Sequence, residues 1–171
     1  MRQRHARTLA LMLQGLESVA VTIVTVSDRV ARGERDDTSG PVLASAFTAL
    51  GAAVTLTVVP DGADHVEAAL RTAIAAGARA VITTGGTGVA PRDQTPQGTA
   101  RVLQVELPGI SERLRATDPV PGSALSRGIA GVAGTALVVN VAGSPAAASS
   151  AANVLPPIVT HALAQLDGRD H

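Results

Sequence analysis

The apolar residues of the chain follow two alternating periods. Continuous β-branched runs at 19–26, 54–59 and 80–84 are typical of strands that are buried on both faces of a sheet. Between these runs, apolar residues recur at helical spacing, first after Pro41 and then after Asp64, and Gly51 and Gly77 supply the helix ends. This β-α-β-α-β order predicts a parallel sheet with right-handed crossover helices.

The second half of the chain carries weaker patterns. We expect a helix that begins near Pro96 and runs past Leu103, and two short strands at 129–132 and 136–141. Between the helix and these strands lies a region that we expect to be irregular; it contains Pro108, Gly109, Pro119 and Pro121. A last helical region opens at Ser144–Pro145, is predicted to break near Pro156–Pro157, and resumes to Leu166.

The elements together predict an α/β fold with three layers, α/β/α, around a mostly parallel sheet. Residues 17–171 are expected to form a single domain, and residues 1–16 an N-terminal tail or an extra turn. Asp64 and Glu67 have the spacing of a capping box. Asp36 and Asp37 are expected to cap the helix that follows them.

Composition excludes several functions. Hydrophobic residues make up 46% of the chain and charged residues 16%, and the formal net charge is zero. No field of one sign would therefore draw the chain to nucleic acid or to a membrane surface. Phe47 is the only aromatic residue, which leaves no platform for stacking bases. No apolar run reaches the ~18 residues that a membrane span needs.

The basic residues and the missing cysteines limit the chemistry further. All fourteen basic residues are arginine, so a Walker-type phosphate loop and a Schiff-base lysine are excluded. Without cysteine there is no disulfide, thiol nucleophile or cysteine-zinc site, and the four histidines, His5, His65, His161 and His171, lack metal-ligand spacing. We expect a cytoplasmic protein.

Polar and glycine-rich segments follow four predicted strands. Ser27-Asp28-Arg29 follows the first strand, Pro60-Asp61-Gly62 the second, Thr84 to Gly88 the third, and Gly143-Ser144-Pro145 the last. Ligands of open parallel sheets bind outside the carboxyl ends of the strands. The four segments therefore predict one shared cleft.

The segment TGGTG, residues 84–88, is the sharpest local signal. Glycines allow positive φ and a close approach of a ligand, and successive backbone N–H groups can form a nest for an anion. The alternative is a tight turn without a ligand. Because Arg92 and Asp93 follow the segment, we favour phosphate binding. A dinucleotide-binding oxidoreductase is a weaker alternative, since GxGxxG is absent and the glycines follow the third strand.

Two aspartates are candidate metal ligands. Asp61 by itself fits a Pro-Asp-Gly turn, and Asp93 by itself fits a loop before a helix that Thr95 would cap. Paired across a phosphate cleft, the two carboxylates would suit Mg²⁺, which prefers one or two carboxylates together with phosphate oxygens and water. Ser126 and Arg127 would bind a phosphate or a pterin carbonyl, or else be a surface arginine beside a serine cap.

These motifs, in this order over roughly 19–166, resemble the MogA/MoaB family of molybdenum cofactor biosynthesis. The resemblance rests on Ser27-Asp28-Arg29, Asp37-Thr38-Ser39-Gly40, TGGTG, Arg92-Asp93-Gln94-Thr95-Pro96, Pro108-Gly109, Leu125-Ser126-Arg127, and Asn140 with Gly143-Ser144-Pro145. It implies a homotrimer that binds molybdopterin and ATP with Mg²⁺, transfers an adenylyl group to molybdopterin, releases pyrophosphate, and passes its product to a molybdenum insertase.

The resemblance places the catalytic and metal-binding roles on Asp61 and Asp93. The residues that we expect to contact the ligands are Ser27, Asp28, Thr84, Gly85, Gly86, Thr87, Gly88, Arg92, Thr95, Ser126, Arg127, Asn140, Gly143 and Ser144.

Three positions depart from the family pattern. Gln97-Gly98 stands where Glu-Ala is usual, Val141-Ala142 replaces Leu-Pro, and Ala146 replaces a common lysine. These changes keep open a second interpretation, a MoaB-like protein that binds molybdopterin without adenylating it.

Overall fold

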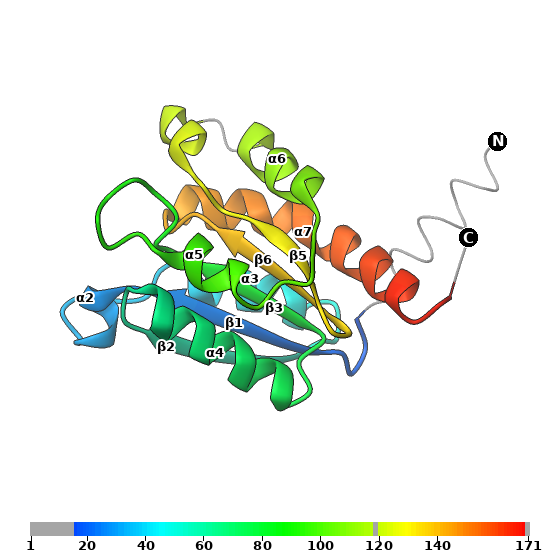
Figure 1. Cartoon of the computed structure of the whole chain (residues 1–171). Coiled ribbons are helices and arrows are strands. Elements are labelled where there is room, and N and C mark those ends of the chain that lie inside the picture. Colours follow the sequence, from blue (N-terminus) through cyan, green and yellow to red (C-terminus); the bar gives the residue numbers. More distant parts are fainter. Residues whose placement is uncertain (1–15, 118–119, 170–171) are drawn as a thin grey trace.

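The computed structural model describes residues 16–117 and 120–169 as a six-stranded sheet between two layers of helices (Figure 1). The strands are β1 (Ala20–Val26), β2 (Ala53–Val59), β3 (Ala80–Thr84), β4 (Val105–Glu106), β5 (Ala130–Ala133) and β6 (Ala136–Val141). The helices are α2 (Asp28–Ala31), α3 (Gly40–Thr48), α4 (Ala63–Ala75), α5 (Thr95–Ala100), α6 (Pro108–Thr117), the 3-10 helix η1 (Pro121–Leu125) and α7 (Pro145–Leu166).

The strand order is β2-β1-β3-β6-β5-β4. The first four strands in this order run parallel, and β5 is antiparallel to both β6 and β4. β1, β3 and β6 form the buried centre of the sheet, which is why their sequences are almost continuously apolar. The predicted α/β fold with a mostly parallel sheet is confirmed.

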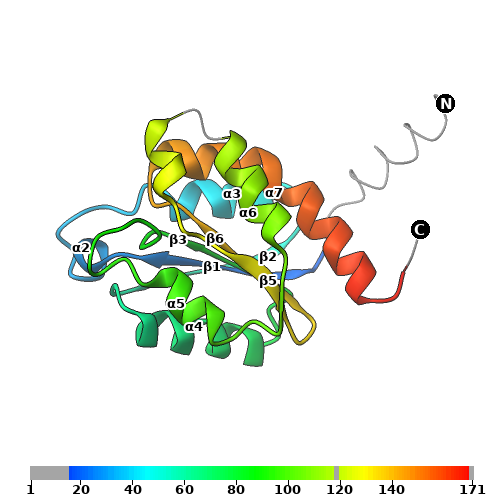
Figure 2. The same cartoon turned by 45° about the horizontal axis from the view of Figure 1, so that its top comes forward.

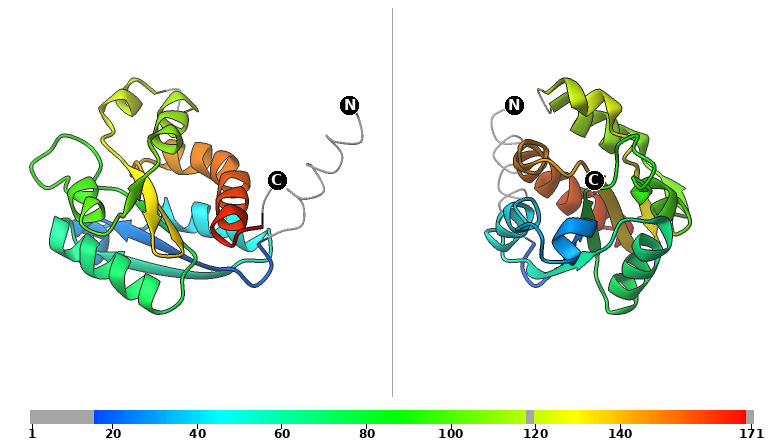
Figure 3. Two further views of the ribbon diagram at one scale, coloured as in Figure 1. Left: turned by 45° about the vertical axis from the view of Figure 1, so that its right-hand side comes forward. Right: turned by 90° about the vertical axis from the view of Figure 1, so that its left-hand side faces the viewer.

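Helices cover both faces of the sheet. Figure 2 shows α4 and α5 on one face and α3, α6 and α7 on the other. Val66 and Leu70 of α4 pack against Val24 and Val81 in one core cluster. The larger cluster, on the opposite face, unites α3, β1, β3, β6 and α7. In both views of Figure 3, α3 and α7 lie beside one another against the sheet.

The segment that we expected to be irregular contains a helix, α6, so that expectation was wrong for residues 108–117. Pro108 is the first residue of α6, a position where the missing N–H of proline costs nothing. Ile110 and Leu114, four residues apart, pack against the larger core cluster. Pro119 lies outside the described residues.

The predicted break at Pro156–Pro157 was also wrong, because α7 continues through both prolines to Leu166. Two prolines remove two backbone donors from the helix. Leu155, Val159 and Leu163 are nevertheless buried in the larger cluster, and this packing holds the helical path on both sides of the prolines.

Three smaller expectations also need correction. Helix α5 ends at Ala100, before Leu103. Asp64 and Glu67 form no capping box, since both carboxylates pair with Arg101 and Gly62 precedes the helix. The expected N-terminal tail, 1–16, lies outside the described residues except for Leu16, which is buried at 2% exposure in the core.

Across residues 16–117 and 120–169, every helix is too short or too polar to cross a lipid bilayer.

Candidate functional site

The carboxyl ends of four parallel strands meet at one edge of the sheet. The register pairs Val26 with Val59 and Thr25 with Thr84, and Thr84 with Val141. The segments after these strands therefore leave the sheet side by side. The shared edge that the sequence predicted is confirmed.

Hydrogen bonds to its backbone carbonyl oxygens hold the segment after β3 in place. Thr95 donates its hydroxyl to the carbonyl of Gly85 at 2.8 Å and its backbone N–H to that of Gly86 at 3.0 Å. Arg127 donates its backbone N–H to the carbonyl of Thr87 at 2.8 Å and its Nε to that of Gly88 at 2.7 Å. Four consecutive carbonyls are thus bound by two residues, Thr95 and Arg127.

The N–H groups of the same segment are left available. Among the described residues, the N–H groups of Gly86, Thr87 and Gly88 have no hydrogen-bond acceptor. Successive free N–H groups can form a nest for an anion such as phosphate. We call residues 85–88 the glycine loop.

Two positions in the glycine loop require glycine. Gly85 has φ of +106°, and a Cβ there would lie 2.3 Å from the carbonyl oxygen of Val26. Gly86 has φ of +62°, and a Cβ there would lie 2.4 Å from the Thr95 hydroxyl. Side chains at these positions would break the contacts that shape the loop.

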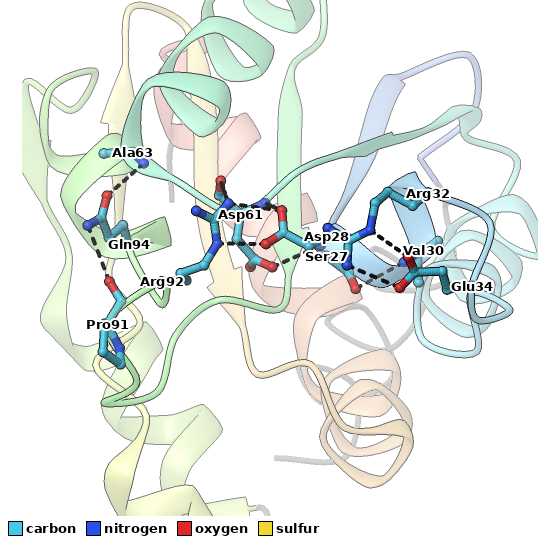
Figure 4. A network of polar contacts seen from close by, with 10 residues as sticks. All are labelled: Ser27, Asp28, Val30, Arg32, Glu34, Asp61, Ala63, Pro91, Arg92 and Gln94. Atoms are coloured by element: carbon cyan, nitrogen blue, oxygen red, sulfur yellow. Dashed lines mark hydrogen bonds and ion pairs between the residues drawn. The ribbon is translucent and has the colours of Figure 1, made fainter.

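Asp28, Asp61 and Arg92 form a compact network beside the loop (Figure 4). Arg92 donates Nε and Nη2 to the two carboxylate oxygens of Asp28 at 2.6 and 3.0 Å, and Nη2 also reaches the carbonyl of Asp61 at 3.1 Å. The backbone N–H groups of Asp28 and Asp61 each donate to the other's carboxylate, at 2.8 and 3.1 Å. The hydrogen bond from Arg92 lowers the pKa of Asp28.

Asp61 and Asp93 each keep one carboxylate oxygen available. Oδ2 of Asp61 accepts from the N–H of Asp28, and Oδ2 of Asp93 accepts from the N–H of Ala90 at 3.0 Å. Within the described part of the chain, Oδ1 of neither residue accepts a hydrogen bond. Each carboxylate is therefore oriented by one oxygen and can offer the other to a ligand or a metal ion.

The two carboxylates line adjoining hollows. The first hollow, about 220 Å³, is lined by Asp61 and by parts of β1, β3 and the 35–39 segment. The second hollow, about 360 Å³, is lined by Asp93, Gly88 and residues of η1. Gly86 and Gly143 line both hollows, so the two hollows adjoin at these residues.

Most of the predicted contact residues line these hollows. Gly86 and Gly143 line both; the others are Ser27, Asp61, Thr84 and Gly85 in the first and Thr87, Gly88, Asp93, Ser126 and Ser144 in the second. Ser27 and Ser144 also cap helices, since their hydroxyls accept from the N–H groups of Val30 and Ala147.

Other predicted contact residues have structural partners instead. The two arginines among the predicted contact residues are occupied, Arg92 by Asp28 and Arg127 by backbone carbonyls, including that of Asp93. Asn140 is 2% exposed and bonds the hydroxyls of Thr83 and Thr99 and the N–H of Ile129. Thr95 is fully buried, and Gln94 rather than Thr95 precedes α5.

Sequence reasoning missed part of the first hollow. Arg35 and Ser39 line it, and the Ser39 hydroxyl donates to the carbonyl of Gly143 at 3.1 Å. Asp37 accepts from the N–H groups of Ser39 and Gly40, which confirms the capping role expected for it. The sequence offered a signal for Arg35, because it lies in the polar segment between the first predicted strand and the helix that begins near Pro41.

The departures from the family pattern have different surroundings. A Cβ at Gly98 would lie 2.4 Å from the carbonyl of Ala63, so glycine lets α5 pack closely on α4. Gln97 and Ala146 are both exposed, so neither is required by the core.

The described residues contain no cluster of three or more histidine, cysteine, aspartate or glutamate side chains that would hold a metal ion. A metal ion at this edge would therefore depend on one or two carboxylates and on its ligand. His5 and His171 lie outside the described residues.

Comparison with known proteins gives consistent matches. The model of the probable molybdopterin binding domain matches residues 22–161. A molybdenum cofactor biosynthesis bifunctional protein of Synechococcus elongatus is 38% identical over 159 residues, covering 91% of this chain and 50% of that protein. The chain therefore spans about half the length of this relative.

Two further matches are of similar size to the chain. A molybdopterin adenylyltransferase of Helicobacter pylori is 33% identical over 136 residues, which cover 76% of this chain and 77% of that protein. The crystal structure of the molybdopterin biosynthesis enzyme MoaB of Thermus thermophilus superposes with a TM-score of 0.78 at 40% identity, covering 88% of this chain and 97% of that one. The chain belongs to the molybdopterin-binding domain family of molybdenum cofactor biosynthesis, and its fold is that of the MogA/MoaB proteins.

Proposed function

We propose that the chain is a molybdopterin adenylyltransferase. An oxygen of the terminal phosphate of molybdopterin attacks the α-phosphorus of ATP, the bond from that phosphorus to the β-bridging oxygen breaks, and pyrophosphate leaves with the electron pair. Such a transfer needs alignment of two phosphates and neutralisation of their charge, and no covalent enzyme intermediate.

The observation that carries the proposal is the row of free N–H groups at Gly86, Thr87 and Gly88. Gly86 lines both hollows, and Thr87 and Gly88 line the second. Two substrates that each bring a phosphate would place those phosphates at this junction, one from each hollow. The fixed carbonyls of the loop keep the N–H groups oriented before either substrate binds.

The donor set fits magnesium. Asp61 and Asp93 each present one free carboxylate oxygen, and Mg²⁺ is usually held by one or two carboxylates together with phosphate oxygens and water. When bound, the ion would neutralise phosphate charge and stabilise the negative charge of the transition state. The chain's own part is to orient the two carboxylates, that of Asp61 through the N–H of Asp28 and that of Asp93 through the N–H of Ala90. Arg127 holds the backbone carbonyl of Asp93.

A second candidate function is binding of molybdopterin without adenylation. Two exposed positions favour it. Gln97 replaces the glutamate that is usual in the family, and Ala146 replaces a common lysine. The relative that is named as an adenylyltransferase is 33% identical to this chain, and the protein named MoaB is 40% identical. Sequence identity therefore does not distinguish the two candidate functions.

Pyrophosphate release tests the proposal directly. Purified protein with Mg²⁺, ATP and molybdopterin should release pyrophosphate, and Asp93→Asn should abolish turnover while largely retaining molybdopterin binding. Asp64→Asn is the matched control, because the Asp64 side chain is 93% exposed and pairs only with Arg101. Tight molybdopterin binding without pyrophosphate release at any ATP concentration would establish the second function instead.

We also propose that the protein works in the cytoplasm as a homotrimer and passes its product to a molybdenum insertase. An exposed apolar edge supports assembly: Leu56 and Val58 of the edge strand β2 are 43% and 37% exposed. Sedimentation equilibrium should give three times the mass of the chain, and a monomer at micromolar concentration would contradict the assembly.

A further inference from the structure

A third recess opens beyond the second hollow, between α6, η1 and the end of β6. It measures about 30 Å³, and its polar lining residues are Ser111, Arg115, Ser123, Ser126 and Asn140. Ser123, Ser126 and Ala142 line both this recess and the second hollow. The three spaces therefore lie next to one another, in the order of the hollow beside Asp61, the hollow beside Asp93 and the recess beside Arg115. We call the third space the α6 recess.

Ser111 contributes an unsatisfied donor to the α6 recess. Its residue exposure is 5%, and its hydroxyl is buried without any hydrogen-bond partner. Burying a hydroxyl without a partner costs about 1–3 kcal/mol, so such groups in native proteins usually have a ligand or a water. It is the only buried side-chain group without a partner in the described part of the chain.

Arg115 adds positive charge at the same place. One helical turn after Ser111, its Nη1 makes long contacts of 3.4 and 3.3 Å with the carbonyls of Ser126 and Gly128. Its Nε and Nη2 have no partner, and no carboxylate forms an ion pair with it, among the residues the structure describes. Among the residues that the structure describes, no acidic side chain lines the recess.

We propose that the α6 recess binds a single hydrogen-bond-accepting group of the substrate, a carbonyl or an anionic oxygen, through Ser111 and Arg115. The recess, at about 30 Å³, has room for one such group and not for a ring, since a cavity needs about 10–15 Å³ to hold a single water. Because the described lining offers hydrogen-bond donors and no carboxylate, it favours a ligand group that accepts hydrogen bonds.

The identity of that group rests on the proposed function. If phosphates meet at the glycine loop, the nucleotide extends along the first hollow, with Asp61, and the other substrate along the second hollow, with Asp93. The far end of that second substrate is a pterin ring, whose edge carries a carbonyl oxygen. The α6 recess then receives this carbonyl and sets the position of the ring.

The test compares substitutions on one helix. Arg115→Met and Ser111→Ala remove the two donors, and Arg113→Met is the matched control, because Arg113 is an exposed arginine of α6 that does not line the recess. Affinities for molybdopterin and for ATP with Mg²⁺ are measured separately by titration. We expect Arg115→Met to weaken molybdopterin about 10–100-fold and Ser111→Ala about 3–10-fold, with ATP affinity unchanged.

The separate titrations distinguish the failures. A wild-type protein that binds no molybdopterin would overturn the proposed function and this assignment with it. Wild-type binding that neither substitution weakens would overturn the assignment alone, as would a loss that falls on ATP instead. If Arg115→Met does not fold, Ser111→Ala decides, because removing a buried hydroxyl without a partner should not destabilise the protein.

Discussion

Arg127 donates its Nε to the carbonyl oxygen of Gly88 at 2.7 Å, across 39 positions of the chain. Its backbone N–H binds the carbonyl of Thr87, and its Nη2 binds that of Asp93. One residue therefore fixes both the end of the glycine loop and the segment that carries the second carboxylate. Under the proposed function, Arg127 would affect a bound phosphate indirectly, through the loop that it orients.

Replacing Arg127 with methionine should loosen the loop without removing a direct ligand contact. We expect the free energy of unfolding to fall by about 1–3 kcal/mol, from the loss of charged hydrogen bonds to two carbonyls. ATP and molybdopterin affinities should both fall, because both phosphates use the same N–H groups. Urea denaturation and the two titrations measure these effects. Arg29→Met, on the exposed side of α2, is the control, and equal behaviour of the two variants would contradict the scaffold role.

Gly86→Ala should disrupt the loop from within. The new Cβ would clash with the Thr95 hydroxyl, so Thr95 would have to release the Gly85 carbonyl. Alanine would also be strained at the φ of +62° that this position requires. We expect a loss of about 1–3 kcal/mol in stability and a large loss of ATP affinity.

Gly109→Ala is the matched control for this substitution. A Cβ at Gly109, inside α6, meets nothing within 4 Å, so the change should leave stability unchanged or raise it slightly. Thermal denaturation of the two variants would contradict the prediction if Gly86→Ala melted as the wild type does.

The sheet and the edge that carries the site could be predicted because their signals are local. β1, β3 and β6 are apolar on both faces, and polar or glycine-rich residues follow each of them. Helices α6 and α7 were misjudged for the opposite reason. Prolines are local signals of interruption, but Pro108 stands at the first position of α6, where it is tolerated. In α7, burial of Leu155 in the core outweighs Pro156 and Pro157, and that packing depends on distant strands.

The partners of the arginines could not be predicted from the sequence. Arg92 closely follows the glycine loop in the sequence, and Arg127 belongs to the Leu-Ser-Arg motif, so a phosphate contact is the natural interpretation of both. The structure pairs Arg92 with Asp28, 64 positions away, and uses Arg127 on backbone carbonyls. Spacing shows which side chains reach one edge, but which of them remain free depends on their three-dimensional neighbours.

The Asp28–Arg92 pair should make stability depend on acid pH. The hydrogen bond from Arg92 lowers the pKa of Asp28 below 3.8 in the folded protein. Because the pKa of Asp28 is lower in the folded than in the unfolded protein, the pair contributes its full stabilisation when the pH is above the unfolded-state pKa. This stabilisation is lost as the pH falls through the folded-state pKa. The stability difference between the wild type and Arg92→Met should therefore be constant from pH 7 to about 5 and should shrink below about 4. Urea denaturation from pH 7 to 3 measures it, and a difference that does not change with pH would contradict the pairing.

Arg35 should bind the phosphates of the nucleotide. It lines the first hollow together with Asp36, Asp37 and Asp61, and it has no ion pair among the residues described. Asp37 is already bound to backbone N–H groups and to the Thr25 hydroxyl, so Arg35 remains available to a triphosphate that enters with Mg²⁺. Arg35→Ala should weaken ATP about 5–20-fold and leave molybdopterin affinity unchanged. Because the contact is exposed, wild-type ATP affinity should fall more steeply with salt than that of the variant. Equal affinities and equal salt dependence would show that the triphosphate does not pass Arg35.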